Sequence, residues 1–324
     1  NDGFTLAEIL VERVSGQSFS AYIEENIRVP LNMWGTKTPQ DKFKKKKLAG
    51  IYSGKLKLPA ENLNQIGAGG IYSTAENLCY LAEVFMKDSE WDNVLTKESA
   101  AMTMELSEPK EGWSALQNKE YGYGLGWDDV NTYPFSQYGV KALVKGGDAI
   151  YCHGSLIVLP EENKAVAVLS SGGSSTVNQI FGSAILLRAL QKDGVIEDIT
   201  SYVQSYEKPV KQMIPSDMKQ YEGYYSNMQD VFKVEMNNDG TMKLTSLGTE
   251  QSNILTYAGN GKFRVLNGTA EYWFVKEENG EVYLRQGSYA SLAGIGNYFM
   301  EVYAAQKIES NPLSEEVAAA WNQR

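Results

Sequence analysis

Histidine and cysteine are almost absent from this 324-residue sequence, which contains His153, Cys79 and Cys152 and no others of these two types. Zinc and other transition-metal sites use several such side chains at characteristic spacings, which these three residues lack. The sequence therefore predicts neither a metal site nor a cofactor. It also contains no apolar run of about 18 residues, so no transmembrane segment is expected in it.

Positively charged residues are outnumbered by negatively charged ones. The sequence contains 30 Lys+Arg and 40 Asp+Glu, which gives a net charge of −10. This balance argues against nucleic acid as a general partner. The one basic cluster lies at 42–47 and is interpreted as a solvated loop, with an anionic polymer or membrane surface as the alternative. The hydrophobic content of 43% is typical of a folded chain, and the length allows two domains.

Residues 1–200 combine helical and strand patterns, which indicates an α+β domain. Apolar residues at helical spacing over 6–14, with Gly16 placed to end the helix, predict the first helix. A capping box at Ser73–Glu76 predicts another helix start. Further helices are expected at 19–27, 96–106 and 177–190.

A strand region is expected to begin at Gly122 and to continue into a hairpin. The hairpin joins the apolar runs 156–159 and 165–169 through the polar loop 160–163. Neither run alternates with polar residues, so both strands are predicted to be covered on both faces.

The pattern changes after residue 200. Residues 201–219 are expected to form a linker. Residues 220–324 contain short runs rich in tyrosine and valine, separated by turn signals such as Asn260-Gly261 and Asn279-Gly280. Strands at this spacing predict an antiparallel barrel or sandwich. The expected architecture is therefore a mixed α+β domain followed by a β-rich domain.

Lys145-Gly146-Gly147-Asp148, just before the hairpin, is the best candidate for a functional site. An ammonium at a strand edge can attract a substrate carboxylate and lower the pKa of a nearby hydroxyl. Glycine lets a ligand lie close to the backbone. A surface lysine without a role is the alternative reading of the same residues.

This stretch resembles the third active-site motif of the serine β-lactamase and penicillin-binding-protein superfamily, in the class C-like branch that also contains esterases and D-amino-acid peptidases. Four other segments resemble motifs of the same family and occur in the family order; they lie at 1–18, 30–33, 68–78 and 123–127. Residues 221–225 resemble the opening of the lipocalin-like β domain that often follows this hydrolase domain.

The resemblance implies roles for individual residues. Asn1 matches the asparagine of the family's Tyr-x-Asn motif, and Lys145 matches its third-motif lysine, so both are expected to be catalytic. Gly146, Gly147 and Asp148 are expected to bind substrate, with the Asp148 backbone N–H directed at the oxyanion.

His153 has no evident carboxylate partner in the sequence, so a structural role is expected for it. The family's Ser-x-x-Lys motif precedes Tyr-x-Asn, and no such motif precedes Asn1. Two chance strings, at 107–110 and 216–219, follow it instead.

The resemblance therefore implies the C-terminal portion of a serine hydrolase with an acyl-enzyme mechanism, whose nucleophile is outside this chain. Its substrate would be a β-lactam, a D-alanyl peptide or an ester. A missing N-terminal segment or a partner chain is expected to complete the fold, and the location is expected to be extracytoplasmic. The alternative is a non-catalytic module that binds peptidoglycan-like peptides or a protein partner.

Overall fold

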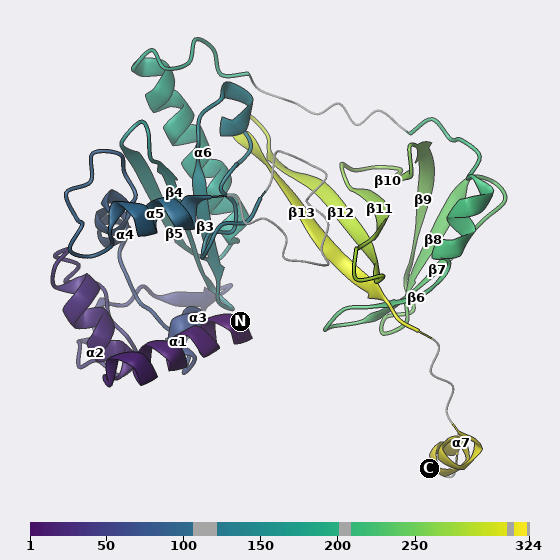
Figure 1. Cartoon of the computed structure of the whole chain (residues 1–324), viewed down its shortest axis with the longest axis horizontal. Helices are drawn as coiled ribbons and strands as arrows, with labels where there is room; N and C mark the ends of the chain where they lie inside the picture. Colours follow the sequence, from purple (N-terminus) through teal and green to yellow (C-terminus); the bar gives the residue numbers. More distant parts are fainter. Residues whose placement is uncertain (106–121, 201–208, 310–313, 323–324) are drawn as a thin grey trace. The chain divides into compact units, whose positions relative to one another are not determined.

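The computed structural model describes residues 1–105, 122–200, 209–309 and 314–322 (Figure 1). These residues form a mixed α+β region followed by a closed antiparallel β-barrel, as predicted. The chain divides into two compact units. Among the described residues, the first unit comprises 1–105, 122–200 and 290–299, and the second comprises the remainder.

Helices form close to each predicted position, and the first unit also contains three short helices, at 45–47, 66–69 and 135–138, that the sequence did not predict. The helices of this unit are α1 (Asp2–Ser15), α2 (Phe19–Ile23) with the π-helical turn η1 (Glu24–Arg28), η2 (Lys45–Lys47), α3 (Ile66–Gly69), α4 (Ala75–Glu83), α5 (Lys97–Met104), η3 (Phe135–Tyr138) and α6 (Ser175–Lys192). Gly16 ends α1 in the left-handed conformation with φ 71°, which glycine adopts without strain.

The cap of α4 differs from the predicted one by one residue. The Thr74 hydroxyl, not that of Ser73, accepts a hydrogen bond from the Asn77 N–H. The Ser73 hydroxyl instead lies 2.7 Å from that of Thr36. The Ser73 hydroxyl is therefore engaged by a neighbouring loop, and Thr74 caps the helix in its place.

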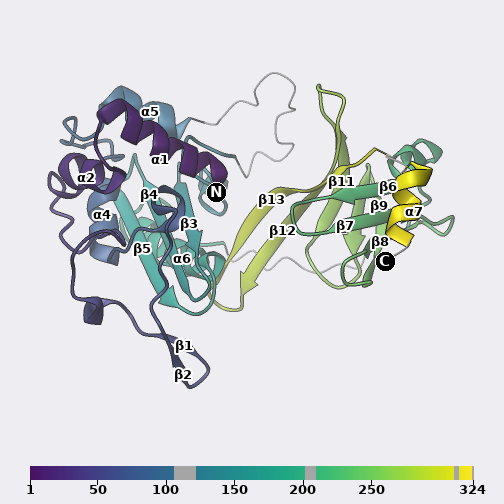
Figure 2. The ribbon, with the colours of Figure 1, turned by 90° about the horizontal axis from the view of Figure 1, so that it is seen from below.

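The central sheet of the first unit has the strand order β3 (Leu143–Asp148), β4 (Cys152–Leu159) and β5 (Lys164–Ser171), all antiparallel (Figure 2). The predicted hairpin is confirmed as β4–β5. A separate small hairpin joins β1 (Ile51–Ser53) and β2 (Leu56–Leu58).

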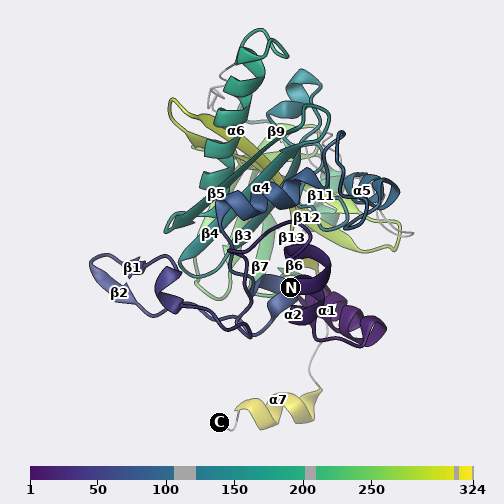
Figure 3. The same ribbon diagram turned by 90° about the vertical axis from the view of Figure 1, so that its left-hand side faces the viewer.

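Helices cover both faces of this sheet (Figure 3). On one face Val144 and Ile157 pack against Leu186 of α6, and on the other Leu143 and Val158 pack with Ala82 of α4. Because side chains alternate along a strand, β4 contributes to both cores.

The predicted burial is right for the apolar part of β4 and wrong for β5. Residues 155–159 of β4 are buried, whereas β5 is only half-buried and Leu169 keeps 42% of its surface exposed. Among the described strands of this sheet, β5 pairs only with β4. An edge strand has fewer neighbours, so its apolar side chains remain partly open to solvent.

No regular strand forms at 122–127, contrary to the prediction. Trp127 is instead buried in the core, where its ring meets Phe85 edge-on with centroids 5.0 Å apart. Among the described residues just after this segment, one isolated bridge joins Asp129 to Val144 of β3. This bridge brings the acidic pair Asp128-Asp129 to the edge of β3.

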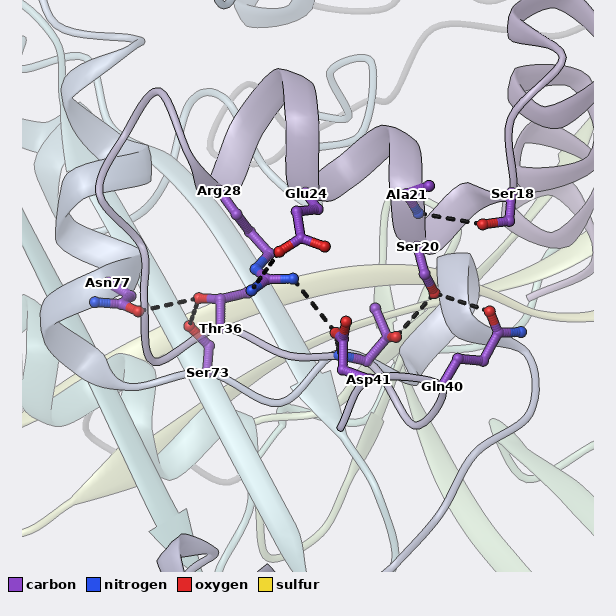
Figure 4. Close-up of polar contacts among 11 residues, drawn as sticks. Ser18, Ser20, Ala21, Glu24, Arg28, Thr36, Gln40, Asp41, Ser73 and Asn77 are labelled. Carbon is purple, nitrogen blue, oxygen red and sulfur yellow. Dashed lines mark hydrogen bonds and ion pairs between the residues drawn. The ribbon is translucent and has the colours of Figure 1, made fainter. Parts of the chain in front are cut away.

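A polar network fixes the loop after η1 (Figure 4). Arg28, only 1% exposed, lies 3.4 Å from the Asp41 carboxylate and 3.5 Å from that of Glu24. The same Asp41 carboxylate accepts a hydrogen bond from the Thr38 N–H. These contacts compensate part of the cost of burying the guanidinium.

The second unit contains an eight-stranded barrel closed by pairing of β10 with β9 and of β13 with β6. Its elements are η4 (Ser216–Tyr221), β6 (Gly223–Ser226), β7 (Val231–Met236), β8 (Thr241–Ser246), β9 (Ser252–Gly259), β10 (Lys262–Val265), β11 (Glu271–Lys276), β12 (Val282–Leu292), β13 (Gly296–Lys307) and the separate helix α7 (Glu315–Asn322). The predicted turns fall between strands, and Asn260-Gly261 adopts positive φ at both residues.

Residues 290–299, at the turn between β12 and β13, belong to the first unit. A Cβ added at Gly296 would lie 3.6 Å from Cγ2 of Ile180, so this turn packs closely on α6. Tyr298 and Phe299 are buried there. No helix in the described part of the chain is long and apolar enough to cross a membrane.

Candidate active site

From Val144 onward, every second backbone N–H of β3 points away from β4, toward the outer edge of the sheet. The Val144 N–H donates to the Asp129 carbonyl, and the Gly146 N–H donates to the Asp128 carboxylate over 2.7 Å. The Ala149 N–H points the other way and donates to Cys152. Because direction alternates along a strand, the Asp148 N–H leaves on the same outer edge as that of Gly146.

The Lys145 ammonium is bound by Asp128. Its Nζ lies 3.0 and 3.2 Å from the two carboxylate oxygens and donates to the Gly146 carbonyl over 2.6 Å. The Lys145 and Asp128 side chains are 40% and 39% exposed, so the pair lies at the surface of the site. The same carboxylate therefore holds both the lysine and the next backbone N–H.

The two glycines face different surroundings. A Cβ at Gly146 would lie 2.9 Å from Gln179 Nε2 and 3.2 Å from Ser175 Cβ, both on α6. A Cβ at Gly147 would meet nothing within 4 Å. Packing against α6 thus explains the first glycine, whereas the backbone at Gly147 is open to an approaching ligand.

Asp148 connects β3 to the start of α6. Its carboxylate accepts hydrogen bonds from the Ser175 N–H at 2.7 Å and the Ser175 hydroxyl at 2.6 Å, and lies 2.6 Å from His153 Nδ1. Partial burial raises the pKa of this carboxyl, but the bonds from Ser175 and His153 outweigh burial and hold the pKa below its usual value. The expectation that His153 lacks a carboxylate partner is wrong.

Asp129, next to Asp128, is fully buried. Its Oδ1 accepts from the N–H groups of Gly122 and Asn131, while its Oδ2 has no hydrogen-bond partner among the described residues. Burial outweighs these bonds and raises the pKa of Asp129 to about 7. Burial, followed by the charges of Asp129 and Asp128, also raises the pKa of Tyr298.

Asn1, the other expected catalytic residue, is exposed at the start of α1, where its carbonyl accepts from the Thr5 N–H. No hydrogen bond joins Asn1 to Lys145 in the part of the chain that the structure describes. Of the two chance strings, 107–110 lies outside the described residues, and 216–219 falls in η4 of the barrel unit. The roles expected for Asn1, Lys145, Gly146, Gly147 and Asp148 stay predictions.

Neither cysteine is a ready nucleophile. Partial burial, followed by the Glu61 carboxylate, raises the pKa of the Cys152 thiol. Burial likewise raises the pKa of Cys79. Only the thiolate is reactive, so both cysteines remain thiols at neutral pH. No group of three or more His, Cys, Asp or Glu side chains suited to a metal occurs among the described residues.

Asp128 is the site residue that reasoning from the sequence missed. It follows Trp127 directly, outside the segment that resembles the family motif, and a lone acidic dipeptide carries little signal. The bridge between Asp129 and Val144, together with the hydrogen bond from the Asp128 N–H to the Val144 carbonyl, brings its carboxylate to Lys145.

Two solved structures of SurE share the fold of this chain. SurE, solved with D-Leu, superposes with a TM-score of 0.56 at 16% identity over 94% of this chain and 65% of that one, and a second SurE structure with 0.56 at 15% over 94% and 67%. The octameric penicillin-binding protein homologue from Pyrococcus abyssi gives 0.45 at 21% over 93% and 64%.

The chain thus spans 65% of the length of the first SurE structure. A search of curated proteins gives no match. The Beta-lactamase family model matches residues 1–189, which is more than half of the chain. The chain therefore belongs to the beta-lactamase family, with a closed β-barrel after the matched region.

Proposed function

We propose that this chain forms one wall of an acyl-transfer site in a serine hydrolase whose nucleophile lies outside it. The observation that carries the proposal is the outer edge of β3, where Lys145, the open backbone at Gly147 and the outward Asp148 N–H occur together. A substrate carbonyl at this edge could place its oxygen on that N–H as negative charge develops.

The reaction would proceed by acyl transfer. A serine hydroxyl attacks an amide, β-lactam or ester carbonyl, its proton passes to the leaving group, and water then releases the acyl group from the serine. Within this chain, Lys145 would contribute charge beside the reacting centre and Asp148 its backbone N–H. The family resemblance favours an extracytoplasmic location for this activity.

We also propose that a further polypeptide segment packs against β5 and carries the serine. The outer edge of β5 has no strand partner among the described residues, and Leu169 on it is exposed. Apolar side chains also face solvent on α1 and α6; they include Leu6, Leu10, Val14, Phe181 and Ile185. A covering segment would remove this apolar area from water.

Intact-mass spectrometry after incubation with benzylpenicillin or an activated ester tests the proposal. The isolated chain is expected to stay unmodified, because none of its described serines has the required lysine partner. A stoichiometric covalent adduct on the isolated chain would contradict this.

The same experiment is then carried out on the longest natural gene product that contains this chain. If it carries an upstream Ser-x-x-Lys, it is expected to form the adduct with the activated ester, and Lys145→Ala is expected to lower kcat and kcat/KM together. Cys152→Ala is the control. Equal, small effects of both substitutions would show that Lys145 has no role in turnover.

A further inference from the structure

Asp128 neutralises the lysine that the proposed function places at the substrate. Both of its oxygens lie within 3.2 Å of Lys145 Nζ, and one of them also accepts the Gly146 N–H. The backbone holds Asp128 in place, because its N–H donates to the Val144 carbonyl at 2.9 Å. The carboxylate is therefore fixed beside Lys145 before any substrate arrives.

The other charges nearby add little positive potential. Asp148 carries a lowered pKa and is ionised at neutral pH, with His153 as its partner. Asp129 lies beside Asp128 and can carry additional negative charge above pH 7, given its pKa of about 7. Lys145 is thus a cation whose charge is already matched by carboxylates.

We propose that Asp128 is a specificity-determining residue, which makes this wall select substrates presenting an uncharged amide or ester beside Lys145 over those presenting a free carboxylate. The inference rests on the proposed function of the β3 edge. An incoming carboxylate would either lie next to Asp128, with like-charge repulsion, or displace it from Lys145 and the Gly146 N–H. An uncharged group meets neither cost.

The test compares two small ligands that differ only in this group, N-acetyl-D-alanine and N-acetyl-D-alanine amide. Backbone NMR titration of the full chain gives a dissociation constant for each and shows whether the signals of 145–148 move. Wild type is expected to bind the amide more tightly than the acid. Asp128→Asn keeps an acceptor for the Gly146 N–H and removes the charge.

Asp128→Asn is expected to tighten binding of the acid about tenfold and to change binding of the amide by less than about twofold, since one opposing charge is removed at a partly exposed site. A gain of affinity cannot result from partial unfolding. The double variant with Lys145→Gln is expected to lose the gain. Asp193→Asn, which removes the carboxylate paired with Lys164 at 2.6 Å, is the control and is expected to change neither ligand.

The outcomes separate the two proposals. The signals of 145–148 could move while the ratio of the dissociation constants for acid and amide is the same in Asp128→Asn as in wild type. This result would overturn the role of Asp128 but not the proposed substrate site at the β3 edge. Tighter binding of the acid than of the amide by the wild-type chain would also overturn the role of Asp128. No movement of these signals with either ligand, in any of the proteins, would overturn the proposed wall and the inference with it.

Discussion

His153 and Asp148 form a close pair across the end of the β3–β4 ladder, with Nδ1 and Oδ1 2.6 Å apart. The same carboxylate accepts two hydrogen bonds from Ser175 at the start of α6. Asp148 thus ties three segments together: its own strand, the next strand and the helix that packs on the sheet. Its backbone N–H points to the outer edge of β3. The side chain therefore joins the segments, while the N–H stays available for a ligand.

Asp148→Asn is expected to lower the free energy of unfolding at pH 7 by about 1 kcal/mol, because charge-assisted hydrogen bonds become neutral ones at a half-exposed position. The folded-state pKa of Asp148 is depressed, so its stabilisation is complete above the ordinary pKa and is lost as pH falls through the folded value. Denaturant unfolding at several pH values is expected to show the two proteins converging at low pH. Asp92→Asn, at an exposed aspartate of the same unit, is the control; a difference that stays constant with pH would contradict the assignment.

Gly146→Ala and Gly147→Ala are expected to act on different properties. Gly146→Ala forces Gln179 and Ser175 to move and is expected to destabilise the fold by about 1–3 kcal/mol, the usual cost of overpacking. Gly147→Ala meets no atom within 4 Å and is expected to leave the melting temperature nearly unchanged while weakening ligand binding at the β3 edge. Melting temperatures and NMR titrations of both variants check this. Normal stability of Gly146→Ala would show that α6 yields more readily than its packing indicates.

Asp129→Asn is expected to stabilise the protein above pH 7. Burial raises the folded-state pKa from 3.8 to about 7, so wild type is most stable below the ordinary pKa and loses stability as pH rises through about 7. Asparagine keeps the acceptor for the Gly122 and Asn131 N–H groups without ionising. A shift of this size corresponds to about 4 kcal/mol at most.

Unfolding free energies of wild type and Asp129→Asn at pH 4 and pH 8 provide the measurement. The curves are expected to lie close together at pH 4 and to separate at pH 8, with the variant more stable. This direction is opposite to that expected for Asp148→Asn. A variant less stable than wild type at both pH values would show that the carboxylate has a partner that compensates its burial.

Local patterns predicted the elements well, and long-range contacts explain the differences. The β4–β5 hairpin and the barrel turns depend on apolar runs and on residues such as Asn260-Gly261, which are visible in the sequence. The cap at Thr74, the partner of His153 and the role of Asp128 depend on segments distant in sequence. Asp128 reaches Lys145 because one bridge joins Asp129 to Val144, and no spacing rule indicates that pairing.

The turn between β12 and β13 was not predictable for a related reason. Residues 290–299 have the composition of a barrel hairpin, and the sequence places them in the domain that starts at 220. The structure groups them with the first unit, where Gly296 packs on Ile180 and Tyr298 is buried. Assignment of a strand to a domain by composition therefore fails at a hairpin whose turn packs elsewhere.

Residues 217–324 and residues 1–200, produced separately, are expected to behave differently. The barrel residues form a closed sheet with their own core, which includes Tyr225, Met242 and Phe263, so 217–324 is expected to unfold cooperatively as a monomer. Residues 1–200 keep the open edge of β5 and the exposed apolar side chains of α1 and α6, and they lose residues 290–299, which belong to the same unit.

A few hundred Å² of uncovered apolar surface forfeits on the order of 5–10 kcal/mol, which is comparable to the whole stability of a domain. Residues 1–200 are therefore expected to associate or to lack a cooperative transition. Thermal unfolding followed by circular dichroism, together with size-exclusion chromatography, distinguishes the two fragments, and mass spectrometry checks each for a companion peptide. A cooperative, monomeric transition of 1–200 without such a peptide would refute the proposed covering segment, because the β5 edge and the apolar faces of α1 and α6 would then be stable in water.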